Sequence, residues 1–591
     1  MAYEYFYPGT LSSLDPEYGE LFTGYRIPAA QLGATTSVQT ANQIKEVTNL
    51  LNQGIKAVEV SVIQPEVFEM IPKQQLKEIN RLSKLTGSET SLHAPTTDPS
   101  GFTQQGWSEV NRAEAEKQFS DIVERGHELS PEGNIPVTIH ASGVPGTEFM
   151  ETKDPETGKM VEVPQRMVAV NQETGEFIPL VREKKILPGM LKPKMYEPKK
   201  ELEIANTSYW DNKLSNLIFY KERGDEIIKG NEFAVTHFLK DLEAGKIDPQ
   251  AMMPAQRQAY DIYKNAKVYL DNSQQTINSL FNQAYKLSDD KGKKILVEAS
   301  KQYRKDLSKF NETKQMSHLS NAIQHLINTM HGMVEHKELT PQIYKPVEQF
   351  VQDKAGQTLG NVAFNAYKKF GEKAPIVSIE NPPYGMAVAR AEDLKKLIDK
   401  SRNQFIQKAR KEGMTESEAK AAANKVIGAT WDTSHISMMR KSGFKPEKLV
   451  EEAKKIAPYV KHVHLNDNFG STHTDLPPGM GSVPMKEILS ELDKVGFKGR
   501  KIFEGGQFFQ HFQTSPHPYV LEALGSPIYG MTAPPYWNQL SATYGNYFAF
   551  PSAYFPEQHF SLFGGGFASL PTELGGQIPG KASRATGTPM A

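Results

Sequence analysis

The fold is decided by four short stretches of the sequence: SLHAP (91–95), TIHAS (138–142), SIENPP (378–383) and TWDTSH (430–435). Each has the residues of a buried strand and closes on His, Asp or Glu. Two later stretches follow the same pattern, KHVHLND (461–467) and KIFEGG (501–506). In a (β/α)₈ barrel the C-terminal ends of all strands meet at one mouth, where the chemistry of that fold is located. The pattern therefore predicts a barrel whose mouth is lined with metal-ligating side chains.

Strand-like and helix-like patterns alternate from about residue 30, which predicts an α/β fold. Eight β/α units with short connections favour a closed (β/α)₈ TIM barrel, and an open doubly wound sheet is the alternative. One long interruption between strands four and five is too long for a loop and must have its own structure. The predicted divisions are an N-terminal extension (1–29), the first barrel half with strands one to four (30–143), an insertion of β-hairpins followed by helices (144–373), the second barrel half with strands five to eight (374–510), and an extension rich in aromatic residues, Gly and Pro whose last part is disordered (511–591).

The composition excludes several classes of site. The chain has 591 residues, a net charge of −1 and no cysteine, so disulfides, thiolate metal sites and thiol nucleophiles are excluded. The balanced charge provides no global field that would recruit a polyanion. The first residues resemble no signal peptide, and no run approaches the roughly 18 apolar residues that span a bilayer. We expect a cytoplasmic protein with no membrane partner; the sequence does not predict its oligomeric state.

Nine side chains of metal-ligand type are expected to converge at the mouth: His93, His140, Glu380, Asp432, His435, His464, His473, Asp475 and Glu504. They are too many for one ion and suit a cluster of two or three. Histidine and carboxylate ligands bind Zn²⁺, Mn²⁺ or Fe²⁺. We expect two or three divalent ions, with Zn²⁺ first and Mn²⁺ as the alternative. A carboxylate can bridge two such ions, and the pair can activate water.

These stretches resemble the xylose-isomerase-like TIM-barrel superfamily and, within it, endonuclease IV, the zinc-dependent apurinic/apyrimidinic endonuclease of AP endonuclease family 2. The resemblance covers roughly residues 30–143 and 374–510. SLHAP, WDTSH and VHLND are the more specific strings; IENPP and IFEGG are less so. The resemblance implies a DNA-repair hydrolase that cleaves a phosphodiester bond at an abasic site.

The resemblance also implies a distribution of ligands. One zinc ion would take His93, His140 and Glu380, and a second would share Glu380 and add Asp432, His464 and Glu504. Glu380 and Glu504 would be the catalytic carboxylates, since Glu380 bridges the ions and Glu504 orients the attacking hydroxide. A third ion would take His435 with a pair that the family orders as Asp-x-His.

Three features depart from the family. The third-site pair here reads His473-Thr474-Asp475, with the ligand types swapped, and Thr96 and Thr97 follow SLHAP where the family has a Tyr that helps to wedge the DNA. The large insertion is also foreign to that enzyme. If DNA is the substrate, the insertion has to supply wedge residues and cations, and its Lys-rich stretches 289–294 and 301–309 are the candidates.

Two other functional classes remain. Sugar isomerases and epimerases of the same superfamily use one divalent ion and a Glu pair that shuttles a proton, and that set would be Glu380, Asp432, His464 and Glu504 acting on a small sugar. A non-catalytic, metal-stabilised binding module is the third class. Beside the ligands, Asn466 and Asp467 are expected to orient ligands. Glu59 is either a substrate contact or a buried structural carboxylate.

Overall fold

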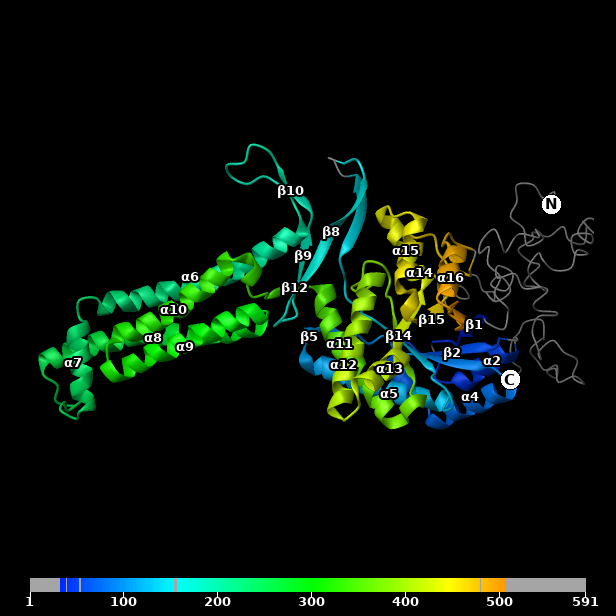
Figure 1. Cartoon of the computed structure of the whole chain (residues 1–591), viewed down its shortest axis with the longest axis horizontal. Helices are drawn as coiled ribbons and strands as arrows, with labels where there is room; N and C mark the ends of the chain where they lie inside the picture. The colour runs from blue at the N-terminus through cyan, green and yellow to red at the C-terminus, as the bar shows by residue number, and fades with distance from the viewer. Residues whose placement is uncertain (1–31, 39, 53–54, 154–156, 479, 506–591) are drawn as a thin grey trace, which may run out of the picture. The chain divides into compact units, whose positions relative to one another are not determined.

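The computed structural model describes residues 32–38, 40–52, 55–153, 157–478 and 480–505. The predicted extensions 1–29 and 511–591 lie outside these residues. Eight parallel strands form a closed barrel in the order β1-β16-β15-β14-β13-β6-β3-β2, which confirms the predicted (β/α)₈ architecture (Figure 1). The barrel strands are β1 Leu32–Thr35, β2 Ala57–Ser61, β3 Glu89–His93, β6 Pro136–His140, β13 Ile376–Glu380, β14 Ile427–Asp432, β15 Val460–His464 and β16 Lys501–Phe503.

Helices connect these strands, and some of them begin at side-chain caps. Ser108 accepts a hydrogen bond from the backbone of Asn111 at the start of α5, and Thr415 and Glu418 form a capping box at the start of α13. The helices of the barrel region are α2 Gln43–Asn52, α3 Pro65–Glu69, α4 Lys73–Thr86, α5 Glu109–Gly126, α11 Val347–Phe370, α12 Ala391–Lys411, α13 Glu416–Val426, α14 Thr433–Ser437, α15 Pro446–Ile456 and α16 Met485–Lys494. A short hairpin, β4 Phe102–Thr103 and β5 Gly106–Trp107, precedes α5.

Side chains alternate along each barrel strand, so that every second residue points into the barrel. Contacts between strands that are not neighbours identify the inward set: the hydroxyls of Thr138 and Thr430 lie 3.0 Å apart, and Nε2 of His462 lies 2.8 Å from Oε2 of Glu59. We call the deeper residues the support layer: Glu59, Ser91, Thr138, Ser378, Thr430 and His462. We call the residues above them the mouth layer: His93, His140, Glu380, Asp432, His464 and Glu504. Because a strand alternates with period two, each mouth-layer residue except Glu504 stands two positions after a support-layer residue.

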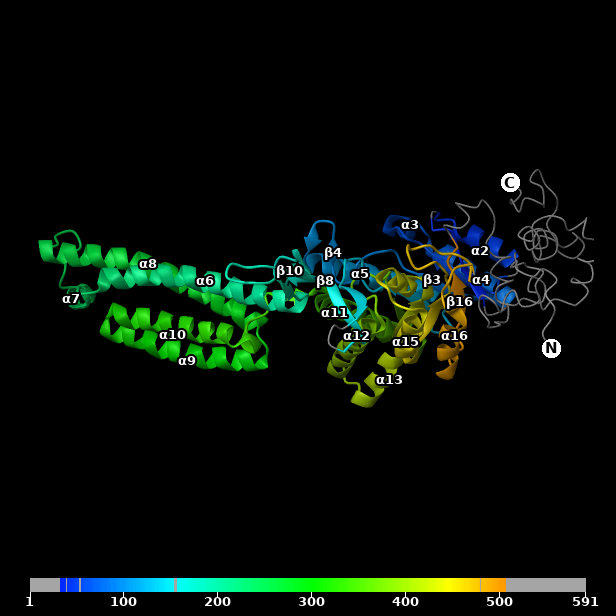
Figure 2. The ribbon, with the colours of Figure 1, turned by 90° about the horizontal axis from the view of Figure 1, so that it is seen from above.

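A second compact unit comprises residues 169–173 and 177–345. Its helices α6, α8, α9 and α10 run side by side in both views (Figures 1 and 2), around a core of aromatic and aliphatic side chains that includes Trp210, Leu270 and Ile323. Its helices are α6 Pro198–Ile228, α7 Glu232–Glu243, α8 Pro254–Leu287, α9 Asp290–Thr313 and α10 Met316–Glu335. The remaining strands are β7 Glu148–Lys153, β8 Met160–Asn171, β9 Phe177–Val181, β10 Glu183–Lys185, β11 Lys194–Tyr196 and β12 Tyr344–Pro346.

The helical unit is shorter than the insertion expected at 144–373. Residues 346–373 cluster with the barrel unit, because α11 packs against α5 and α12 and is therefore the helix that follows the fourth barrel strand. The chain leaves the barrel after β6 and rejoins it at residue 346, just before α11. The alternation of strand and helix in the barrel is therefore complete. Among the described residues, no helix combines the length and apolar character that crossing a bilayer requires.

Candidate metal centre at the barrel mouth

The first group of ligand-type side chains consists of His93, His140 and Glu380. They end the neighbouring strands β3, β6 and β13, which places them on one side of the mouth. Nε2 of His93 lies 3.3 Å from Oε2 of Glu380, and Nε2 of His140 lies 3.2 Å from the same oxygen. Ligands that share one ion stand at such separations, because each bond to the ion is about 2.0–2.2 Å long.

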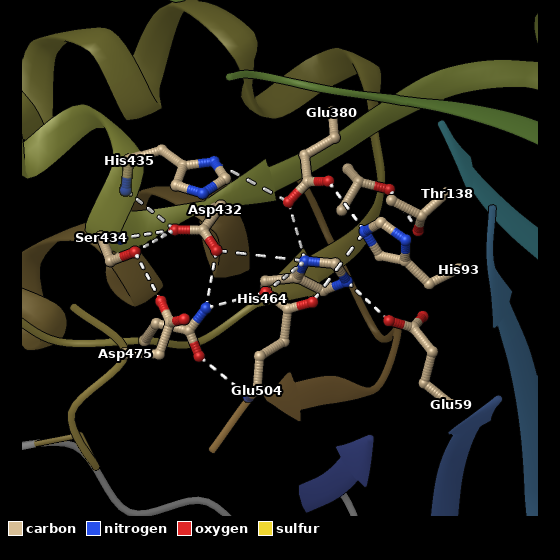
Figure 3. Close-up of polar contacts among 12 residues, drawn as sticks. Glu59, His93, Thr138, Glu380, Asp432, Ser434, His435, His464, Asp475 and Glu504 are labelled. Carbon is tan, nitrogen blue, oxygen red and sulfur yellow. Dashed lines mark hydrogen bonds and ion pairs between the residues drawn. The ribbon is translucent and has the colours of Figure 1, made fainter. Parts of the chain in front are cut away.

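The second group consists of Glu380, Asp432, His464 and Glu504, whose ligand atoms all lie within 4.8 Å of one another. Nδ1 of His464 is at its centre, 2.9 Å from Oε1 of Glu380, 3.3 Å from Oε2 of Glu504 and 4.0 Å from Oδ2 of Asp432. Figure 3 shows these side chains pointing toward one another from β13, β14, β15 and the end of β16. Three carboxylates around one imidazole leave this group rich in negative charge.

Glu380 connects the two groups. Its Oε2 faces His93 and His140, while its Oε1 faces His464. The side chain is completely buried, so its orientation is determined by these neighbours and not by solvent. A carboxylate that directs one oxygen to each of two ligand groups has the arrangement of a bridging ligand between two ions.

The remaining predicted ligands lie at the edge of the second group. Nδ1 of His435 donates to the carbonyl of Asn381 at 2.7 Å, which leaves its Nε2 without a proton when the ring is neutral. Nε2 of His473 lies 2.9 Å from that atom and 3.5 Å from Oδ1 of Asp475. The swapped pair thus stands beside His435. Within the described ranges, however, the groups whose ligand atoms all lie within 4.8 Å of one another do not include this trio.

Hydrogen bonds hold the carboxylates in place. Oδ1 of Asp432 accepts from the backbone N–H groups of Ser434 and His435 at 2.7 and 2.9 Å, so Oδ2 is the atom left to face His464. The Asn466 amide donates to Oδ2 of Asp432 at 2.7 Å and to Oε2 of Glu504 at 3.1 Å. Asn466 therefore orients two ligand-type side chains, the role expected from the sequence. Asp467 instead accepts from the backbone of Val483 and organises the loop after β15.

The protonation of the histidines follows from their neighbours. Burial alone would lower the pKa of His93, but its hydrogen bond to Glu380 and the charges of Glu380 and Glu504 raise that pKa to about 9. Burial lowers the pKa of His140 to about 4, against the attraction of Glu380. Burial opposes ionisation of Glu380, yet His140 and His464 hold its pKa well below the usual range. Without an ion, His93 therefore retains a proton and its positive charge near neutral pH, whereas His140 is neutral.

The support layer reaches the second group through Glu59. This carboxylate is fully buried, and its Oε1 lies 2.9 Å from Nε2 of His464, the ring nitrogen that does not face Glu380 (Figure 3). Ser91 donates to its Oε2 at 2.8 Å. Of the two roles expected for Glu59, the contacts favour a buried carboxylate over a substrate contact. His462 escaped the sequence analysis, although its position two residues before His464 places both imidazoles inside the barrel.

The comparisons with known proteins bear on the fold. Residues 376–507 match the family model described as the xylose isomerase-like TIM barrel, and they include β13 to β16 with Glu380, Asp432, His464 and Glu504. The match is therefore to the second half of the barrel. The description of this model agrees with the superfamily expected from the sequence. No curated protein matches the chain by sequence.

Two solved structures match this chain. One is titled a D-tagatose 3-epimerase-like protein, with 12% identity, a TM-score of 0.35 and coverage of 83% of this chain and 98% of that chain. The other is titled D-psicose 3-epimerase with D-tagatose from Clostridium cellulolyticum H10, with 8% identity, a TM-score of 0.34 and coverage of 80% and 84%. Both titles name sugar epimerases and neither names a nuclease. At this level of identity and TM-score, they say nothing about the reaction of this chain.

Proposed function

We propose that the protein is a divalent-metal-dependent hydrolase of phosphodiester bonds with at least two ions at the barrel mouth. The observation that carries the proposal is the division of the Glu380 carboxylate, whose two oxygens face two separate ligand groups. The donor set of nitrogen and oxygen atoms suits Zn²⁺ or Mn²⁺. Ions bound there would polarise a phosphoryl oxygen and lower the pKa of a water molecule.

The chain's own groups have distinct tasks in such a reaction. Glu504 keeps 21% of its side chain exposed whereas Glu380 keeps none, so Glu504 is the carboxylate available to orient a water molecule and accept its proton. Asn466 fixes the Glu504 carboxylate for that task. His435 and His473 lie next to each other at the edge of the second group, where they can hold a third ion or, when protonated, donate hydrogen bonds to phosphate oxygens.

Abasic duplex DNA is the proposed substrate, and it requires cations along the flanking phosphates. The candidate stretches both lie on α9. In the stretch 301–309, Lys301 pairs with Glu298 and Lys309 with Asp306, so part of that charge is neutralised. Lys291 and Lys294, in the stretch 289–294, are exposed and are therefore the better candidates for phosphate contacts.

The proposal is tested by incubating metal-loaded protein with abasic duplex DNA and with bis(p-nitrophenyl) phosphate. We expect cleavage that a chelator stops, and a loss of about 100-fold or more in Glu504→Gln, comparable to the removal of a catalytic acid or base. Reversing Lys291 and Lys294 to Glu should weaken DNA binding and reduce its salt dependence, yet leave cleavage of the small ester unchanged. Absence of cleavage of both substrates by protein of full metal content would contradict the proposal.

Sugar epimerisation is the second candidate, and one observation favours it. Glu380, Asp432, His464 and Glu504 already form one compact group, which supplies a complete ligand set for a single ion together with two glutamates for proton transfer. This chemistry leaves His93 and His140 without a task. Incubation of a ketose in D₂O distinguishes the candidates, since an epimerase incorporates deuterium at the carbon next to the carbonyl and a hydrolase does not.

A further inference from the structure

The inference concerns Glu59, a carboxylate in the middle of the barrel that neither candidate reaction uses. It lies on β2, its side chain is completely buried, and three polar groups surround it. Ser91 and His462 lie 2.8 Å from its Oε2, and His464 lies 2.9 Å from its Oε1. Among the described residues no Lys or Arg forms an ion pair with Glu59, so histidines alone face its charge.

His464 stands between Glu59 and the mouth. Its Nδ1 faces Glu380 and Glu504, and its Nε2 faces Glu59 (Figure 3). Nε2 of His464 and Oε1 of Glu59 are both buried and make no hydrogen bond of standard geometry within the described part of the chain. The two atoms lie 2.9 Å from each other. A neutral imidazole carries one proton, and a metal ion takes the nitrogen that lacks it.

We propose that Glu59 is a positioning residue that keeps the proton of His464 on Nε2 and so presents Nδ1 to a metal ion. A carboxylate behind a metal-bound histidine fixes the ring orientation and raises the basicity of the ligand. Glu59 also adds a negative charge behind a group that already holds three carboxylates, which disfavours an empty site and favours a cation. The inference rests on the metal site of the proposed function, but it holds for both candidate reactions because each needs His464 as a ligand.

The support layer offers a matched control for this role. Thr138 lies in the same layer and its hydroxyl contacts that of Thr430 at 3.0 Å, so Thr138→Val also removes a buried polar group. No described hydrogen bond or ion pair joins Thr138 to His464. Glu59→Gln keeps the size of the side chain and an oxygen for Ser91 and His462, but it removes the charge.

The test measures Zn²⁺ affinity by competition with a chromophoric chelator. We expect Glu59→Gln to weaken the ion at the second group by about 10–100-fold, the usual effect of removing a carboxylate behind a metal-bound histidine. Thr138→Val should stay close to wild type. An equal loss in both variants would mean that any defect in this layer loosens the site, and an unchanged affinity in Glu59→Gln would mean that the carboxylate does not act on His464; either result overturns the proposal.

A second measurement needs only the wild-type protein and one assignment variant. Nitrogen NMR of ¹⁵N-histidine-labelled, Zn²⁺-loaded protein, with the His464 signals assigned through His464→Gln, should show a proton on Nε2 and none on Nδ1. A proton on Nδ1 overturns the proposal. Both readouts are independent of turnover, so a protein that binds Zn²⁺ as expected but cleaves no phosphodiester contradicts the proposed function and leaves the role of Glu59 intact.

Discussion

The interiors of the barrel and of the helical unit are built from different residues. The helical core consists of side chains such as Trp210, Leu270 and Ile277, with no exposed surface. The barrel interior buries Glu59, Glu380, Asp432 and His464 just as completely. Burying an ionised group costs several kcal/mol unless a partner compensates it, whereas burying an aliphatic side chain stabilises by roughly 1.5–3 kcal/mol. The side chains of the helical core thus stabilise the fold, whereas the buried charges of the barrel interior cost stability and suit the binding of cations.

The largest expected effect is the loss of metal that follows substitution of Glu380 in the barrel interior. Glu380→Gln removes the charge that both ligand groups share, so we expect loss of metal from both. The Zn²⁺ affinity should fall by more than about 100-fold, the upper limit for residues that only hydrogen-bond to a metal ligand. Elemental analysis after purification without chelator measures it. Ser378→Ala, two residues earlier on the same strand and deeper in the barrel, is the control and should retain its metal. Wild-type metal content in Glu380→Gln would show that Glu380 is not a bridging ligand.

In the helical unit, a core substitution is expected to lower stability and to leave the metal content unchanged. Leu270 is completely buried in its core, and Leu270→Ala should lower the free energy of unfolding of that unit by about 2–5 kcal/mol. Urea denaturation followed by circular dichroism measures the loss, and metal analysis of the same sample should give the wild-type value. Phe233 on α7 is 85% exposed, and Phe233→Ala should change the free energy of unfolding by no more than about 0.5 kcal/mol.

The sequence predicts the barrel more completely than the interior. All eight strands were predictable because each is a buried, strand-forming run and most are followed by a run of helical spacing, and the ligand-type residues that end six of them pointed to one mouth. The contacts of Glu59 with His462 and His464 across the barrel were not predictable. They join residues about 400 positions apart, which come together only when the barrel closes. The end of the insertion was also hidden: α11 looks like any other helix there, and only its packing against α5 and α12 assigns it to the barrel.

A smaller effect is expected from pH. The pKa of His93 is raised to about 9, although burial lowers it, because Glu380 and Glu504 favour the protonated ring. Below that pH, an ion has to displace this proton before it can bind Nε2. Metal affinity should therefore rise with pH until about 9 and level off above it. Chelator competition between pH 6 and 9.5 measures the trend. If the metal affinity does not change with pH over this range, the ion does not displace the proton on His93, and His93 is not a ligand.

The number of ions per chain tests the bridged centre most directly. Protein purified without chelator, saturated with Zn²⁺ and freed of excess metal should be analysed for metal and protein in the same sample. The two groups that share Glu380 predict at least two ions per chain, and three if His435, His473 and Asp475 hold one as well. One ion per chain would contradict the bridged centre, because the group formed by Glu380, Asp432, His464 and Glu504 would then suffice by itself.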